Sequence, residues 1–194
     1  MPRCLTTVAA LLLVSVLASP ARAQTQVPNE GMYSVGLNAG FARPTDDFLN
    51  TGFNLGANAE WYVTPRISIR GALTGAWFDD DTFEDTTLSP MAFTVNGVHN
   101  WERGAWHPYA TAGLGLYRYR LSDEFFEDLF EDENTETKFG VNLGGGLEYF
   151  FTRRDTLTGE IQYHLVPGDM DNLLVDYDTN YWSFSFGYKR YFGG

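Results

Sequence analysis

The sequence predicts an all-β protein, an eight-stranded antiparallel up-and-down transmembrane β-barrel with short turns at one end and four long acidic loops at the other. Three observations carry this prediction. Apolar and polar residues alternate with period two in eight blocks of roughly ten residues. The connections between the blocks alternate between short and long. Aromatic residues make up 16% of the chain, which a water-exposed surface does not need but two membrane interfaces use.

The N-terminal 23 residues have the pattern of a secretory signal peptide. Arg3 precedes an apolar run over 8–17, and the segment ends in Ala21-Arg22-Ala23. The alternative, a membrane anchor helix, needs ~20 apolar residues, and this run is shorter. We therefore expect cleavage before Gln24, with 1–23 absent from the folded protein.

The rest of the chain is predicted to consist of a short N-terminal segment over 24–30 and one outer-membrane β-barrel over 31–194. The only cysteine, Cys4, lies in the signal peptide. We therefore expect no disulfide, no cysteine-bound metal and no thiol nucleophile in the mature chain.

Each of the eight blocks has one apolar, aromatic face and one face of small or polar residues. In the last block, Trp182, Phe184 and Phe186 alternate with Ser183 and Ser185. The blocks cover residues 33–42, 53–63, 66–78, 91–101, 109–121, 139–151, 157–165 and 181–192.

The fifth block has an ambiguous phase. Leu114 and Leu116 place the apolar face on even positions, whereas Tyr117 and Tyr119 against Arg118 place it on odd ones. A β-bulge near Gly113 or Gly115 would reconcile the two halves, because a bulge inserts one extra residue into a strand.

The composition of the polar face indicates whether that face points into the barrel or towards water. It is rich in glycine, serine and asparagine, which fit the crowded interior of an eight-stranded barrel better than a water-exposed surface. A secreted lipocalin-like ligand-binding barrel, with the apolar face inward, is the alternative. Because an unpaired buried charge costs several kcal/mol, the charged residues of the polar face are predicted to form one ion-pair network inside the lumen. These residues are Glu60, Glu148, Glu160, Arg70, Arg118 and Lys189.

Acidic residues are concentrated in the long connections. Removal of 1–23 takes away two arginines, so the mature chain has 11 basic and 25 acidic residues and a formal net charge of −14. Nineteen of the acids lie in the four long connections, which would repel nucleic acid. We expect extracellular contacts at Asp79, Asp80, Asp81, Phe125, Phe126, Phe130, Asp176 and Asp178.

Carboxylates are hard oxygen ligands, so loosely bound Ca²⁺ or Mg²⁺ is expected at these loops, bridging to lipopolysaccharide, with no cofactor otherwise. Asp176 and Asp178 have the opening spacing of a calcium loop without its glycine and closing glutamate. In the third connection, Phe125, Phe126 and Phe130 have helical spacing, which favours an apolar patch for an extracellular protein partner or an extension of the hairpin.

One constellation is compatible with an enzyme. His164 is expected on the inward face of the seventh block, beside Ser183 or Ser185 of the eighth, with Glu160 near. Serine, histidine and an acid are the groups used by outer-membrane enzymes that modify lipid A, so this activity is the alternative to a non-enzymatic role. An open aqueous channel is not expected, because such pores belong to barrels of about 16–18 strands.

Over residues 31–192 the chain resembles the small OmpA/OmpX-type outer-membrane barrels. The resemblance rests on the eight-block layout, on Pro108-Tyr109 followed by Gly113-Leu-Gly115-Leu-Tyr117, and on the aromatic last strand. It implies a bacterial outer-membrane location, contact with outer-membrane lipid, and a structural or surface-interaction role without enzymatic activity. It also implies an insertion signal at Tyr188 and Phe192 for the barrel-assembly machinery, from which Arg190 and the final two glycines depart.

Overall fold

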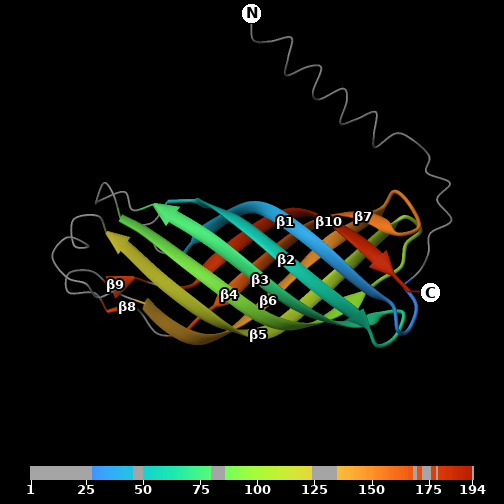
Figure 1. The fold of residues 1–194 in the computed structure, drawn as a ribbon, viewed down its shortest axis with the longest axis horizontal. Coiled ribbons are helices and arrows are strands. Elements are labelled where there is room, and N and C mark those ends of the chain that lie inside the picture. Colours follow the sequence, from blue (N-terminus) through green and yellow to red (C-terminus); the bar gives the residue numbers. More distant parts are fainter. Residues whose placement is uncertain are drawn as a thin grey trace, which may run out of the picture.

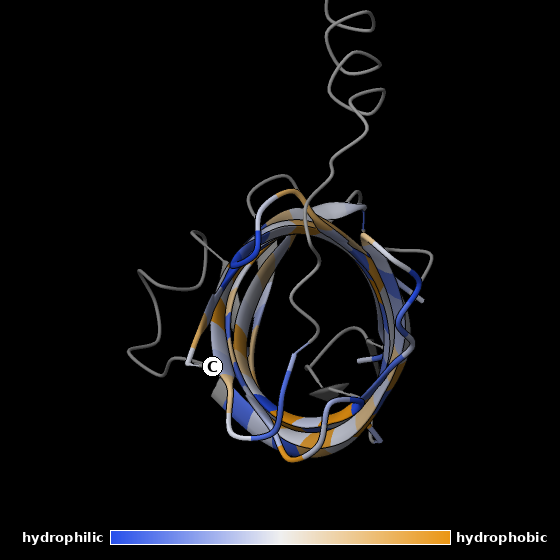
Figure 2. Ribbon diagram, turned by 90° about the vertical axis from the view of Figure 1, so that its right-hand side faces the viewer, coloured by the Kyte–Doolittle hydropathy of each residue, from blue (hydrophilic) through white to orange (hydrophobic). Residues whose placement is uncertain are grey.

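A computed structural model describes residues 28–45, 50–79, 86–123, 135–167, 170–171, 176–177 and 179–193. Eight of its strands close into one barrel, in the order β1-β10-β7-β6-β5-β4-β3-β2, and every neighbouring pair is antiparallel (Figure 1). Viewed from the end at which β10 finishes, the strands form a complete ring (Figure 2). No helix in the described part of the chain is long and apolar enough to cross a membrane. The predicted all-β, eight-stranded antiparallel barrel is confirmed.

Each predicted block forms one barrel strand. The barrel strands are β1 (Tyr33–Pro44), β2 (Gly52–Tyr62), β3 (Ile67–Asp79), β4 (Thr86–Asn100), β5 (Trp106–Asp123), β6 (Thr135–Phe150), β7 (Asp155–Leu165) and β10 (Tyr181–Phe192). The fourth long connection also contains a pair of two-residue strands that the sequence did not predict, β8 (Met170–Asp171) and β9 (Asp176–Tyr177).

The two ends of the barrel differ. Residues 63–66, 101–105 and 151–154 form tight connections at the end where β1 begins and β10 ends, which we call the short-turn end (Figure 1). Threonine hydroxyls stabilise two of these turns, because Thr64 Oγ1 accepts from the Ile67 amide at 3.0 Å and Thr152 Oγ1 from the Asp155 amide at 2.9 Å. We call the opposite end the long-connection end.

Several strands extend further than the alternation predicted at the long-connection end. β4 begins at Thr86 rather than 91, and β6 begins at Thr135 rather than 139. Asp79 accordingly lies within β3 and Glu136 within β6. The added residues include Thr86-Thr87 and Thr135-Glu136-Thr137, which are polar at successive positions and so lack the apolar–polar contrast that marks a strand in sequence.

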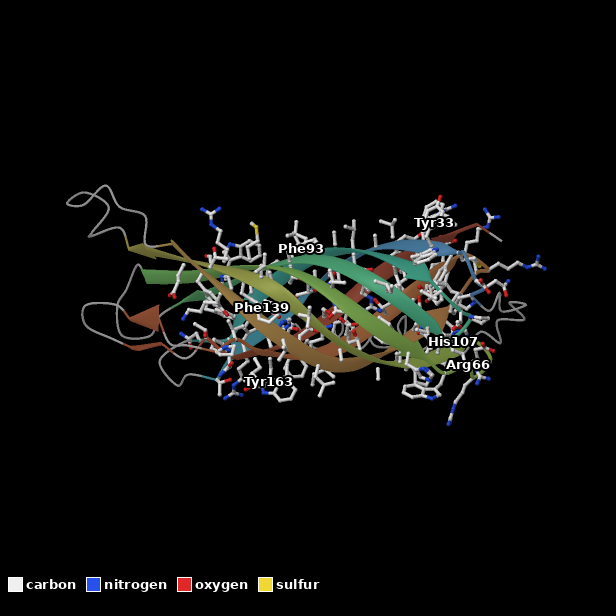
Figure 3. The ribbon with its side chains drawn as sticks, turned by 90° about the horizontal axis from the view of Figure 1, so that it is seen from below. Tyr33, Arg66, Phe93, His107, Phe139 and Tyr163 are labelled. Carbon is white, nitrogen blue, oxygen red and sulfur yellow. The ribbon has the colours of Figure 1, made fainter. Side chains whose placement is uncertain are left out.

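The apolar faces of the strands point away from the barrel, as predicted. Leu143 is 67% exposed, Leu55 52% and Phe184 42%. Figure 3 shows Tyr33, Phe93 and Tyr163 projecting from the outer surface. This orientation is the opposite of the lipocalin-like arrangement, in which these side chains would fill a dry core.

The bulge considered in β5 does not form, and the ion-pair role of Arg118 is wrong. Pairing of β5 with β4 runs without interruption from Tyr109 to Asp123, so one phase holds throughout. Tyr117 and Tyr119 therefore face the lumen and are buried, whereas Arg118 is exposed on the outside. Gly140 leaves room for the Tyr117 ring, since a Cβ there would lie 2.9 Å from the ring. Arg118 lies near the strand end, where a long side chain can reach polar surroundings.

Candidate functional site

The lumen is the polar centre of the molecule, and its inward side chains form layers along the barrel axis. The layer at the short-turn end is aromatic and contains Met32, Tyr62, Phe150 and Tyr191, all buried. The Tyr62 and Tyr191 hydroxyls are 2.8 Å apart, and the Phe150 ring lies 5.2 Å from that of Tyr191. His107 packs on Phe150 with a ring distance of 4.7 Å. These contacts fill part of the lumen cross-section at this end.

Above this layer, five charged side chains from five strands form one linear chain of alternating sign. Arg70 donates from Nε to Glu60 at 3.0 Å and from Nη1 to Glu160 at 2.5 Å. Lys189 lies 2.9 Å from Glu60 and 3.5 Å from Glu148. The order along the chain is therefore Glu160, Arg70, Glu60, Lys189, Glu148. The structure brings together five of the six residues that the sequence assigned to the lumen network.

Hydroxyl groups bind the carboxylates of this chain. Tyr109 donates to Glu160 at 2.7 Å, and Tyr191 donates to Glu148 at 2.9 Å. Ser68 donates to Glu60, and Thr156 donates to Glu148 at 2.5 Å. Full hydrogen bonding is what makes buried charges tolerable in a site of low dielectric.

The position of Tyr109 depends on a neighbouring glycine. A Cβ on Gly146 would lie 2.4 Å from the Tyr109 hydroxyl oxygen, so only glycine leaves space for this ring. Tyr109 also lies under the Arg70 guanidinium, with 5.0 Å between Cζ and the ring centre. This tyrosine therefore stabilises both members of one ion pair.

A polar chamber of about 30 Å³ lies between the charged chain and the long-connection end. Its walls come from β1, β2, β3, β4, β7 and β10, and Arg70 and Glu160 line it from the charged chain. Three of its asparagines, Asn54, Asn58 and Asn96, each have a buried Oδ1 without a hydrogen-bond donor among the described residues.

A second aromatic layer lies in the lumen towards the long-connection end. It contains Phe78, Tyr117, Tyr119, Tyr181 and smaller buried residues. The Tyr181 ring stacks on His164 at 4.3 Å with an interplanar angle of 11°. Tyr119 donates from its hydroxyl to the Thr179 carbonyl at 2.7 Å. The chamber thus lies between two aromatic layers.

The structure assembles only part of the predicted serine–histidine–acid arrangement. His164 Nε2 lies 3.1 Å from Ser183 Oγ, but its Nδ1 lies 3.0 Å from the Tyr117 hydroxyl rather than from a carboxylate. Glu160 instead binds Arg70 and Tyr109. His164 and Ser183 are both buried inside the lumen, on the opposite side of the wall from the lipid-facing surface.

The residues of the predicted insertion signal lie at the outer surface of β10. Phe192 stacks on Tyr33 with 5.2 Å between ring centres. Tyr188 is exposed and donates from its hydroxyl to Asp155, which also lies 3.4 Å from Arg190. Arg190, which departs from the usual pattern of this signal, therefore has a counter-ion near the short-turn end.

Most of the predicted loop contacts fall outside the described residues. These are Asp80, Asp81, Phe125, Phe126, Phe130 and Asp178. Asp79 ends β3, and Asp176 pairs with Asp171 in the β8–β9 ladder. In the described part of the chain, no group of three or more histidine, cysteine or acidic side chains is arranged to hold a metal ion.

Sequence reasoning missed the hydroxyl partners of the charged chain, chiefly Ser68, Tyr109, Thr156 and Tyr191. The alternation of each strand already indicated that these residues face inward, and the structure places each of them on the inward face. Parity alone does not identify which inward residues on different strands lie at the same height in a tilted barrel.

The outward apolar belt and the filled polar lumen define an integral outer-membrane β-barrel. The chain belongs to the outer membrane protein beta-barrel domain family, whose profile matches residues 9–189. Its place in the bacterial outer membrane, expected from the sequence, is thereby confirmed.

A 22 kDa outer membrane protein of Rhizobium leguminosarum bv. viciae is 30% identical over 97 residues, which is 50% of this chain. The match spans 40% of that relative's length. The fold is similar to that of OprG from Pseudomonas aeruginosa, with a TM-score of 0.70, 12% identity and coverage of 88% of this chain and 100% of that one. Neisserial surface protein A has a TM-score of 0.64, 16% identity and coverage of 83% and 99%. Ail, the attachment invasion locus protein of Yersinia pestis, has a TM-score of 0.58, 14% identity and coverage of 84% and 99%.

Proposed function

We propose that this protein is a closed, non-enzymatic surface barrel that presents its acidic connections as an interaction surface outside the cell. The observation that carries the proposal is the filled lumen. Two aromatic layers and a chain of five charged side chains occupy its cross-section between the ends. A barrel without an open path performs its role at its rims and on its outer wall.

The distribution of charge supports the long-connection end as the interaction surface. Arg66, Arg103, Arg153 and Arg154 are exposed in the short turns, whereas 16 of the 25 acids lie in the long connections and three more, Asp79, Asp123 and Glu136, lie at the adjoining strand ends. With the short turns in the periplasm, the acidic side faces outward. The surface then attracts divalent cations, which bridge it to lipopolysaccharide phosphates, and an extracellular protein with a basic face.

The comparison with Ail sharpens the expected partner. Ail has been crystallised with the heparin analogue sucrose octasulfate, a polyanion. The acidic connections of the present chain would repel such a ligand, since like charges brought together at an interface cost several kcal/mol. The proposed surface therefore selects cationic partners.

The closed lumen is tested by conductance. The purified protein is reconstituted into planar bilayers beside a wide trimeric porin as positive control. We expect no stepwise conductance of porin size, because the lumen is occupied by paired charges and rings. Regular porin-sized steps from the folded protein would overturn the proposal.

The acidic surface is tested on whole cells. The variant D79N/D80N/D81N removes three charges from the end of β3 and the long connection that follows it, and E102Q removes one charge from a short turn as control. We expect the triple variant, and not E102Q, to bind less of a fluorescent polylysine probe at low salt. Equal probe binding by the triple variant, or preferential binding of heparin by the native protein, would contradict the acidic-surface role.

A further inference from the structure

The last barrel strand carries a positive charge on its lipid-facing side. Arg190 lies on the outward face of β10, between the outward positions of Tyr188 and Phe192, and its side chain is 53% exposed. This is the residue that departs from the usual pattern of the insertion signal. A guanidinium at the edge of an apolar belt is stabilised by polar or anionic groups at the membrane surface, which its long side chain can reach.

The counter-ion of Arg190 holds this side chain in place without using all of its donors. Asp155 Oδ1 accepts a hydrogen bond from Tyr188 and lies 3.4 Å from Arg190 Nη1, while Oδ2 accepts from Thr152 Oγ1 at 2.7 Å. A guanidinium has five N–H donors, and 3.4 Å is longer than an ordinary N–H···O bond. The exposed guanidinium of Arg190 can therefore donate to a second anion.

The β6–β7 turn brings two more arginines to the same place. The Arg154 carbonyl accepts from the Tyr191 amide at 2.7 Å, which places this turn residue beside the residue that follows Arg190 in β10. Thr152 Oγ1 accepts from the Arg154 amide at 3.2 Å and so helps to fix the turn. Arg153 and Arg154 are both exposed. We call Arg153, Arg154 and Arg190 the arginine cluster, which outnumbers its one neighbouring acid, Asp155, by three charges to one.

The arginine cluster adjoins apolar surface on its membrane side. The rings of Phe151 and Tyr188 lie 6.4 Å apart and are 41% and 40% exposed. Leu157, which pairs with Tyr188, is 48% exposed, and Phe186 is 71% exposed further along β10. Uncharged residues therefore lead from the cluster into the lipid-facing belt. A soluble anion would contact only the arginines, whereas a lipid would contact both surfaces.

We propose that Arg154 and Arg190 bind the phosphate of an anionic membrane phospholipid such as phosphatidylglycerol, with Arg153 adding to the positive potential. The acyl chains of this lipid lie along Leu157 and Phe186. Guanidinium groups bind phosphate oxygens through paired, charge-assisted hydrogen bonds, and aromatic side chains such as Tyr188 lie at the height of lipid headgroups. The site is at the opposite end of the barrel from the acidic connections, so it does not depend on the surface role proposed above.

The other two short turns provide a matched control. Arg66 and Arg103 are exposed at the same end, one in each turn, and Figure 3 shows Arg66 there. The acid Glu102 directly precedes Arg103. The variants R154Q/R190Q and R66Q/R103Q therefore remove the same number of charges from the same end, but only the first removes the proposed phosphate ligands.

The test measures lipid binding to the full-length mature protein, refolded and held in mild non-ionic detergent. Phosphatidylglycerol or phosphatidylcholine is titrated in, and native mass spectrometry counts the lipids that stay bound. We expect the native protein to bind one phosphatidylglycerol in preference to phosphatidylcholine. The affinity for phosphatidylglycerol should fall about 10–30-fold in R154Q/R190Q, since an arginine at a membrane surface contributes about a factor of five. It should stay close to the native value in R66Q/R103Q.

Two further measurements separate a lipid site from simple charge attraction. R154K/R190K keeps both charges but not the planar fork, and should bind with intermediate affinity. Inorganic phosphate at the concentration of the lipid should not displace it, because phosphate lacks the acyl chains. The shift in gel mobility on heating shows which variants are folded, and R154Q and R190Q singly replace the double variant if it does not fold.

Three results would overturn the proposal. The first is equal binding of phosphatidylglycerol and phosphatidylcholine by the native protein. The second is an equal loss of affinity in R154Q/R190Q and R66Q/R103Q, which would assign the attraction to the net charge of the whole end. The third is displacement of the bound lipid by inorganic phosphate at equal concentration, which would make the cluster a site for free anions.

Discussion

Replacing Arg70 by methionine removes the one side chain that joins Glu60 to Glu160. Arg70 is 4% exposed, and its two contacts come from two different nitrogen atoms, Nε at 3.0 Å and Nη1 at 2.5 Å. Methionine keeps much of the length and none of the charge. In R70M, Glu60 retains Lys189 and Ser68, but Glu160 retains only Tyr109 among the described residues.

Breaking a buried ion pair from one side costs about 3–5 kcal/mol, because a carboxylate is left buried without its counter-ion. This loss corresponds to about 2–4 orders of magnitude in the unfolding equilibrium constant. The double variant R70M/E160Q removes the stranded charge, so it should regain at least about 1.5 kcal/mol, a typical value for a hydrogen bond to a charged group. R70K keeps the charge but cannot reach both carboxylates with separate nitrogens, and should fall between R70M and the native protein.

The measurement is the urea midpoint of folding in detergent micelles, followed by the shift in gel mobility between folded and heat-unfolded protein. R190M is the matched control, since Arg190 is 53% exposed and lies 3.4 Å from Asp155, and an exposed pair of this kind contributes about 0–1 kcal/mol. If R70M and R190M shift the midpoint equally, the lumen chain does not stabilise the barrel and the reasoning is refuted.

Three further outcomes follow from the same coordinates. G146A should lower the free energy of unfolding by about 1–3 kcal/mol in urea titration, because the new Cβ would lie 2.4 Å from the Tyr109 hydroxyl oxygen. G71A is the control and should be nearly neutral, since a Cβ there has nothing within 4 Å. Equal effects of the two variants would contradict the packing described. L143R places a charge on the lipid-facing surface, where Leu143 is 67% exposed. It should lower the free energy of unfolding in bilayers by about 2–4 kcal/mol, because the folded state buries the charge in hydrocarbon and the unfolded chain does not. An unchanged urea midpoint would place this face outside the hydrocarbon. H164A should leave the lipid A composition of expressing cells unchanged by mass spectrometry, since His164 is buried in the lumen, and an altered acylation pattern would favour the enzymatic alternative.

Much of the fold could be predicted from alternation alone, because a strand between lipid and a polar lumen has opposite solvents on its two faces. Leu55, Leu143 and Phe184 were placed outward on this basis, and the exposed fractions agree. The prediction failed where the contrast weakens. In β5 the inward Tyr117 and outward Arg118 reverse the usual polarity near the membrane boundary, where rings can fill a lumen and arginine can reach water.

The five residues of the charged chain could also be predicted from the sequence, because a charged residue on an inward strand face needs a partner of opposite sign. The order of these residues along the chain, and the excess of carboxylates over cations, could not be predicted. They depend on which residues of tilted, staggered strands share one height, and on Arg118 being outside.

The sequence by itself determined the number of strands, the direction of their faces and the separation of acidic from basic connections, because these follow from local composition and period. Only the tertiary structure decided that an aromatic layer lies towards each end of the lumen and that a chamber lies beside Glu160. Both features arise from closure of the barrel, which brings inward side chains from distant parts of the chain to within contact distance and excludes the rest.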